Sequence, residues 1–187
     1  MASALVLCGT TLVAALREGG HVVVMRHASS LDGRPEKSAI DLENPARERE
    51  LDDAGQSFAR VLGETLRTLR IPFGEVFTSP SYRARQTVRL VGLPHAQSVR
   101  ELDESPAGSQ ANAIDCAAWL RATTTRYPAL GSNTLVVTHT PNLVDAFAEL
   151  GSMLAPGEAL IFRPTQQGGA DLVAHIKIGD WKHLASI

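Results

Sequence analysis

The stretch Val22-Val23-Val24-Met25-Arg26-His27-Ala28 decides the fold class of this chain. Its four apolar residues in a row predict a fully buried strand, and a cation and an imidazole follow directly at the end of that strand. In an open α/β sheet, ligands bind at the carboxyl ends of the strands. The stretch therefore predicts a core strand that carries Arg26 and His27 to the ligand-binding edge of a sheet.

A second strand end follows the same logic. Residues 75–78 predict a short strand, and Ser79-Pro80 after it predicts an N-cap with proline at the first position of a helix that runs to about residue 91. Arg83 lies near the start of that helix, where free backbone N–H groups already favour an anion. A cation at this position works against the helix dipole, which indicates some use other than helix stability.

A third strand end carries the second histidine. Residues 134–138 predict another buried strand, and His139 follows it directly. Thr140-Pro141 predict the start of a helix that ends at residue 150, with Gly151 as its C-terminal signal. If these strands are parallel, their carboxyl ends meet at one edge, so we expect Arg26, His27, Arg83 and His139 to converge.

The rest of the chain completes one α/β domain over residues 1–187. The expected architecture is a three-layer sandwich, with a mostly parallel central sheet and helices on both faces. Its other predicted elements are helices at residues 10–18, 53–71 and 112–127, an edge strand at 98–102, and strands at 159–162 and 172–178. Gln86 and Thr87 are expected to hold local structure and not substrate.

Composition excludes several classes of protein. The net charge of −2 and the pI near 6.3 argue against nucleic-acid binding, which needs a basic surface. The apolar residues 4–16 are too few to span a bilayer, and the first basic residue is Arg17, so the usual positive start of an export signal is absent. A trimmed or atypical export signal stays open, although Cys8 and Cys116 without a disulfide pattern favour a reducing compartment.

The loop over residues 29–50 is long, polar and carries Pro35 and Pro45. A loop of this length inside a compact domain is usually functional or mobile. We take Ser30 and Arg34 as candidates for substrate binding, and Lys37, Arg47 and Arg49 as further cations that could face a substrate. A solvated surface loop is the alternative for each cation.

Two guanidiniums, two imidazoles and two helix N-termini around one cavity would bind a phosphate dianion. Transfer of that group needs a nucleophile, and an uncharged imidazole nitrogen can attack phosphorus. The guanidiniums favour this role because neighbouring positive charge disfavours the imidazolium. The predicted site could therefore bind a phosphoryl group or transfer one.

At these positions the chain resembles the histidine phosphatase superfamily, also called phosphoglycerate mutase-like, and in particular its small phosphatases. Four blocks carry the resemblance in family order. They are Met25-Arg26-His27-Ala28, where the family has Arg-His-Gly; Leu51-Asp52-Asp53-Ala54-Gly55, which is similar to Leu-Thr-x-x-Gly; Thr78-Ser79-Pro80-Ser81-Tyr82-Arg83-Ala84-Arg85-Gln86-Thr87, which is similar to Ser-Ser-Pro-x-x-Arg-Ala-x-Gln-Thr; and Val136-Val137-Thr138-His139, which resembles the strand with the second histidine.

The resemblance implies a role for each of these residues. His27 is expected to be phosphorylated, with Arg26, Arg83 and His139 binding the phosphoryl group and Thr140 beside them. A carboxylate near the third motif protonates the leaving oxygen in related enzymes. Val99-Arg100-Glu101 resembles the Leu-x-Glu that supplies it, so Glu101 is the first choice and Asp103 the second, although the Gly-rich continuation usual after that Glu is absent.

The sequence therefore predicts a metal-independent phosphatase that hydrolyses a phosphomonoester or phosphoramidate through a phosphohistidine on His27. No cofactor or metal is expected, because the histidines lack ligand spacing. The expected partner is a phosphorylated small molecule or phosphoprotein, with no nucleic acid and no membrane. A phosphosugar mutase and a phosphate-binding protein without turnover remain the alternatives, and substrate, compartment and oligomeric state stay open.

Overall fold

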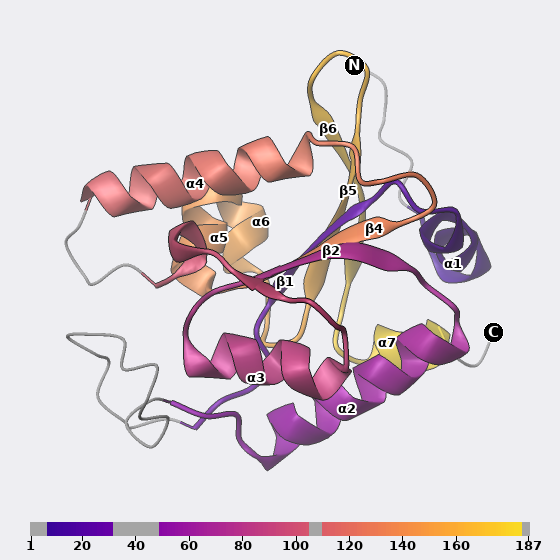
Figure 1. Cartoon of the computed structure of the whole chain (residues 1–187), viewed down its shortest axis with the longest axis horizontal. Coiled ribbons are helices and arrows are strands. Elements are labelled where there is room, and N and C mark those ends of the chain that lie inside the picture. Colours follow the sequence, from indigo (N-terminus) through magenta and orange to yellow (C-terminus); the bar gives the residue numbers. More distant parts are fainter. Residues whose placement is uncertain (1–6, 32–48, 105–109, 185–187) are drawn as a thin grey trace.

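A six-stranded sheet forms the centre of the fold (Figure 1). The computed structural model describes residues 7–31, 49–104 and 110–184. The strands are β1 (Val22–Arg26), β2 (Phe73–Thr78), β3 (Gln97–Ser98), β4 (Asn133–Thr138), β5 (Ala159–Pro164) and β6 (Ala170–Ile176). They lie in the order β3-β2-β4-β1-β5-β6. The first four are parallel, and β5 and β6 are antiparallel to their neighbours, so the expected mostly parallel sheet is confirmed.

Helices cover both faces of this sheet (Figure 1). One face is covered by α1 (Gly9–Glu18), α2 (Asp53–Thr68), α3 (Tyr82–Val91) and α7 (Asp180–Leu184), and the other by α4 (Gln110–Thr124), α5 (Thr140–Phe147) and α6 (Glu149–Ser152). The three-layer α/β fold is therefore as expected. In the part of the chain that the structure describes, no helix is long and apolar enough to cross a membrane.

The apolar run in β1 is explained by burial on both faces. Side chains alternate along a strand, so Val23 and Met25 join one core cluster while Val22 and Val24 join the other. All four side chains are almost completely buried. A strand packed on both sides in this way shows a continuous apolar run instead of alternation, which is the pattern from which it was predicted.

Two helix starts differ from the sequence expectation. The pattern Asp53-Ala54-Gly55-Gln56 predicts a capping box that begins at Asp53, but helix α2 is capped one residue earlier by Asp52, whose carboxylate accepts a hydrogen bond from the Gly55 N–H. Helix α3 begins at Tyr82 with Ser81 as its N-cap, and not at Pro80. Ser79 instead accepts a hydrogen bond from the Ser81 N–H, which forms a side-chain turn ahead of the helix.

Two other elements are shorter than expected. The helix after β4 does not continue to residue 150, because Ala148 has a φ of 50° and separates α5 from α6. Gly151 therefore lies inside α6 and not at a helix end. The edge strand at 98–102 is reduced to β3, and the 3₁₀ turn η2 (Arg100–Leu102) follows it.

Candidate active site

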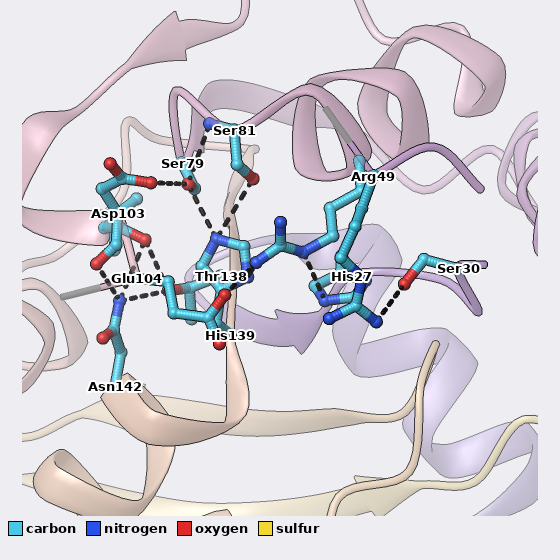
Figure 2. A network of polar contacts seen from close by, with 12 residues as sticks. His27, Ser30, Arg49, Ser79, Ser81, Asp103, Glu104, Thr138, His139 and Asn142 are labelled. Atoms are coloured by element: carbon cyan, nitrogen blue, oxygen red, sulfur yellow. Dashed lines mark hydrogen bonds and ion pairs between the residues drawn. The ribbon is translucent and has the colours of Figure 1, made fainter. Parts of the chain in front are cut away.

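The carboxyl ends of β1, β2 and β4 meet, as expected for parallel neighbours, and Arg83 joins the two histidines there. The Nε of Arg83 lies 3.2 Å from Nε2 of His27, and its Nη2 lies 3.0 Å from Nδ1 of His139. The two imidazole rings stand edge to face, with centroids 5.1 Å apart. Three residues that are up to 112 positions apart in the sequence therefore form one cluster (Figure 2).

His27 is held as a neutral ring with a defined tautomer. Its Nδ1 lies 2.7 Å from the carbonyl oxygen of Ala28, which can only accept a hydrogen bond, so Nδ1 carries the proton. The lone pair therefore lies on Nε2, where it accepts the hydrogen bond from Arg83. Burial, followed by the Arg83 guanidinium, lowers the pKa of His27 to about 3. The ring is uncharged at neutral pH and offers an unprotonated nitrogen to the site.

His139 has the opposite tautomer. A guanidinium only donates, so Nδ1 of His139 accepts from Arg83, and the ring proton lies on Nε2. Nε2 donates to the hydroxyl of Ser79 at 2.8 Å and lies 3.2 Å from that of Ser81. Complete burial and then the Arg83 charge hold the pKa of His139 well below its usual value. The ring is therefore neutral and bridges Arg83 to the β2–α3 turn.

Arg26 reaches the site from the end of β1. One of its terminal nitrogens donates to the carbonyl oxygen of Leu154 at 3.0 Å, and its buried Nε has no hydrogen-bond partner among the described residues. Its charge also contributes to lowering the pKa of His27. Arg26 thus brings its Nε to the same edge, as a donor that has no partner in the described part of the protein.

Arg49 is one of the loop cations expected to face a substrate, and it lies near the cluster. Its Nη2 donates to the hydroxyl of Ser30 at 3.0 Å (Figure 2), and its Nε donates to the carbonyl oxygen of Leu31. Its charge lowers the pKa of His27 and of His139, so Arg49 acts on the same cluster. Ser30, expected to bind substrate, here holds Arg49. Arg34, Lys37 and Arg47 lie outside the described residues.

Glu104 is the carboxylate that contacts the cluster. It forms an ion pair with Nη2 of Arg83. Asp103 lies one step further away, because its carboxylate accepts from the Ser79 hydroxyl, which in turn accepts from Nε2 of His139. Glu101 lies on η2, and among the described residues no hydrogen bond or ion pair joins it to His27, Arg83 or His139.

The sequence itself contains a signal for Glu104. Leu102-Asp103-Glu104 also has the Leu-x-Glu pattern, three residues after Val99-Arg100-Glu101. Leu102 is completely buried in the core, which fixes the Leu of this second copy in the apolar layer. The pattern that indicated Glu101 therefore fits Glu104 as well, and the structure gives the contact with Arg83 to Glu104.

One family model matches the part of the chain that carries most of the cluster. The model of the histidine phosphatase superfamily (branch 1) matches residues 22–109, a span that contains His27, Arg83 and Glu104. This match supports the histidine phosphatase superfamily for the chain. His139 lies beyond the matched residues, and the fold brings it into contact with Arg83.

Solved structures with this fold include three that are similar over most of the chain. The protein histidine phosphatase SixA complexed with tungstate is 22% identical with a TM-score of 0.61, covering 85% of this chain and 97% of that one. The alpha-ribazole phosphatase from Shigella flexneri is 19% identical with a TM-score of 0.59, covering 81% and 94%.

The third is a phosphoserine phosphatase mutant from Entamoeba histolytica in complex with phosphoserine. It is 13% identical with a TM-score of 0.57, covering 84% of this chain and 97% of that one. Identities at this level establish the shared fold of the superfamily. No curated protein matches the sequence.

Two side chains of the third motif, Gln86 and Thr87, hold the backbone near the cluster in place. The Leu51 N–H donates to Oε1 of Gln86, and the Ala28 N–H donates to the hydroxyl of Thr87. The structural role expected for Gln86 and Thr87 is therefore confirmed. Thr140 is the first residue of α5 and follows His139 directly.

The cluster has the chemistry of an oxyanion site. Arg26, Arg49 and Arg83 bring positive charge, and α3 and α5 begin at the same edge, where the N-terminal end of a helix favours an anion. Two carboxylates, Asp103 and Glu104, lie on one side of it. Within the described residues, no group of three or more His, Cys, Asp or Glu side chains is arranged to hold a metal ion. The arrangement can bind a phosphoryl group and present an unprotonated nitrogen to it.

Proposed function

We propose that this protein is a phosphatase that transfers the phosphoryl group of its substrate to Nε2 of His27 and then to water. The observation that carries the proposal is the hydrogen bond from Nδ1 of His27 to the Ala28 carbonyl, which leaves the Nε2 lone pair among guanidiniums. A neutral imidazole with its lone pair directed into an anion site can act as a nucleophile. The match to the histidine phosphatase superfamily supports the same reaction.

In the first half of the reaction, Nε2 of His27 attacks phosphorus and the bond to the leaving oxygen breaks. Arg26 and Arg83 hold the phosphoryl oxygens, because their donors already face this edge of the sheet, and His139 joins them when Nδ1 takes a proton in place of the hydrogen bond from Arg83. Charge stabilisation by such preorganised groups is usually the largest contribution to phosphoryl transfer. Nδ1 of His27 stays protonated, and its bond to Ala28 stabilises the positive charge that develops on the ring.

We assign the proton for the leaving oxygen to Glu104. Phosphoryl oxygens compete with the Glu104 carboxylate for the same Nη2 of Arg83, so substrate binding displaces Glu104 from that ion pair. The released carboxylate takes up a proton from solvent, lies beside the bound substrate and donates this proton to the leaving oxygen. In the second half, the carboxylate takes a proton from water, the water oxygen bonds to phosphorus, and the P–N bond breaks.

The substrate class follows from the leaving group. A phosphomonoester has a poor leaving oxygen and needs the proton from Glu104, whereas a phosphoramidate needs less help. Structures with this fold include the protein histidine phosphatase SixA and a phosphoserine phosphatase, so relatives of both kinds share the architecture. The presence of a carboxylate on Arg83 favours a phosphomonoester for this chain, as a small molecule or on a protein.

Trapping of the intermediate tests the proposal. Wild-type protein mixed briefly with a ³²P-labelled phosphomonoester should retain label that is stable in base and lost in acid, as expected for a P–N bond. His27→Ala should retain no label and should release no phosphate. The matched control is His95→Ala, which changes an exposed histidine outside the cluster.

Two results would overturn the proposal. Appreciable phosphate release by His27→Ala would move the nucleophile to another residue. A burst of leaving group without further turnover would indicate a phosphate-binding protein that has lost hydrolysis. Product analysis with a phosphoglycerate separates hydrolysis from transfer, because a mutase would form the isomeric phosphoglycerate faster than free phosphate.

A further inference from the structure

The side-chain amide of Asn142 joins the end of β4 to the turn that carries the carboxylates (Figure 2). Its Nδ2 lies 2.9 Å from the carbonyl oxygen of Leu102, 3.0 Å from that of Asp103 and 2.9 Å from the hydroxyl of Thr138. Two of these partners are carbonyls, which only accept, so the nitrogen and not the oxygen of the amide faces them. Asn142 is almost completely buried, and its two N–H groups serve three acceptors.

Thr138 strengthens the same connection. Its hydroxyl donates to the carbonyl oxygen of Leu102 at 3.0 Å and accepts from Asn142. Thr138 immediately precedes His139, and Asn142 lies one turn later on α5. The same short segment of chain therefore carries His139 and holds the backbone of Leu102 and Asp103.

The segment after β3 has little sheet pairing of its own. Strand β3 consists of Gln97–Ser98 only, and the last hydrogen bond that ties this edge to β2 runs from the Val99 N–H to the carbonyl oxygen of Thr78. Beyond that point the backbone turns through η2, and the carbonyls of Leu102 and Asp103 bond to side chains instead of to a strand. The position of Glu104 relative to Arg83 therefore depends on these side-chain bonds.

We propose that Asn142 is a positioning residue that sets the Glu104 carboxyl group, and with it the Asp103–Ser79 pair, against Arg83 and His139. The inference rests on the proposed phosphatase function and on Glu104 as its proton donor. Donors to carbonyls fix the backbone while they leave both carboxyl groups directed at the site. Displacement of a catalytic group by about 1 Å is enough to lose a large factor in rate.

Asn133 provides a matched control at the far end of β4. It is also a buried asparagine, and its Nδ2 donates to the carbonyl oxygens of Leu16 and Pro72 at the opposite end of β4 from the site. Asn142→Ala and Asn133→Ala therefore each remove a buried amide that bonds to backbone carbonyls, the first on α5 just beyond the site end of β4 and the second at the start of β4. A purely structural role should give the two variants the same kinetic profile at temperatures where both are folded.

The readout is the dependence of rate on the leaving group. We expect Asn142→Ala to lower kcat/KM for an alkyl phosphate by about 10-fold or more, since proton donation typically contributes about 10²–10⁴. The value of kcat/KM for p-nitrophenyl phosphate should change by less than about 3-fold, because its leaving group needs no proton and kcat/KM does not include the later attack of water on the phosphohistidine. The dissociation constant of tungstate, a phosphate analogue, should stay within the same small factor. Asn133→Ala should change neither the ratio of the rates with the two substrates nor the dissociation constant of tungstate.

A double-mutant cycle identifies the group through which Asn142 acts. In a Glu104→Gln background, Asn142→Ala should cause little further loss with the alkyl phosphate, because the proton donor is already absent. An undiminished further loss would overturn the inference. Equal losses on both substrates in the single Asn142→Ala variant, or the same leaving-group dependence in Asn133→Ala, would overturn it as well.

A second pair of variants allows the same test if Asn142→Ala does not fold. Thr138→Val removes the hydroxyl that bonds to Leu102 and Asn142, and Thr134→Val removes a buried hydroxyl from the other end of β4. Thr138→Val should show the leaving-group dependence in weaker form, and Thr134→Val should not. Failure of the proposed function is recognised separately, because wild-type protein would then form no phosphohistidine with either substrate.

Discussion

Nε of Arg83 donates a hydrogen bond to Nε2 of His27, the nitrogen that we propose attacks phosphorus, across 3.2 Å. The same guanidinium contacts His139 and Glu104 through Nη2. Arg83 therefore contacts both the nucleophile and the carboxylate. A phosphoryl group that enters the site must take over these donors, and it thereby releases the lone pair of His27 and the carboxyl group of Glu104 together.

The first prediction concerns Arg83→Lys. The lysine keeps the positive charge but loses the planar fork that reaches His27 and His139 at once. We expect kcat/KM to fall by about 10²–10³-fold, as for the loss of one preorganised donor at a developing charge. Steady-state kinetics with p-nitrophenyl phosphate measure the effect. Arg89→Lys, at an exposed position of the same helix, is the control, and similar losses in both variants would contradict the assignment of Arg83.

The convergence of His27, Arg83 and His139 could be predicted because each follows a strand that sequence alone identifies. Val22–Val24 and Leu135–Val137 are apolar runs buried on both faces, and parallel strands end at one edge. The meeting of these side chains at one edge can therefore be predicted without any information on side-chain contacts. The same reasoning fails for β3, because a two-residue edge strand has no periodicity to detect.

The roles of Glu104 and Arg49 could not be predicted in the same way. Glu101 and Glu104 lie in nearly identical local patterns, and the choice depends on the η2 turn, which Asn142 and Thr138 hold from α5 and β4. Arg49 stands next to the cluster because Ser30 and Leu31 accept its hydrogen bonds. The Arg83–Glu104 ion pair joins residues 21 positions apart and the Arg49–Ser30 hydrogen bond residues 19 positions apart. The local sequence pattern does not choose between Glu101 and Glu104, and it does not show which loop cation reaches the cluster.

The second prediction separates the two candidate proton donors. Glu104→Gln should lower kcat/KM for an alkyl phosphate by about 10²-fold or more and should affect kcat/KM for p-nitrophenyl phosphate much less, because only the alkoxide needs a proton in the step that kcat/KM reports. Glu104→Gln should also bind tungstate more tightly, since the carboxylate no longer competes for Arg83. Glu101→Gln should change neither the ratio of the rates with the two substrates nor the affinity for tungstate. The reverse result for the two variants would restore Glu101 as the acid.

The third prediction concerns stability below neutral pH. The fold lowers the pKa of His27 from 6.5 to about 3, so the unfolded state binds more protons than the folded state between these values. The free energy of unfolding therefore falls as pH decreases from 6.5 toward 3, by about 1.4 kcal/mol per pH unit for each such histidine. His139 adds to the same slope, because its pKa is also lowered. Urea unfolding between about pH 7 and 5 measures it.

The contribution of His27 can be isolated with a variant. His27→Gln should reduce this slope by the share of one histidine, whereas His95→Gln, at an exposed position, should leave the slope as it is. An NMR titration of the His27 ring is an independent measurement, and we expect the ring to be neutral at about pH 5. A His27 titration near its ordinary pKa would contradict both the burial argument and the neutral nucleophile.

The fourth prediction concerns Gly55, which couples the first turn of α2 to the segment after His27. A Cβ at this position would overlap the carbonyl oxygen of Ser29, and the Gly55 N–H bonds to the helix cap Asp52. Gly55→Ala must therefore push Ser29 away from the helix, which we expect to cost about 1–3 kcal/mol of stability. The shift also moves Ala28, whose carbonyl fixes the tautomer of His27, so kcat should fall even well below the Tm. Thermal unfolding and p-nitrophenyl phosphate turnover measure the two effects, with Gly179→Ala, where a Cβ meets open space, as the control. Unchanged stability in Gly55→Ala would mean that the Ser29 backbone is not packed against α2 in solution.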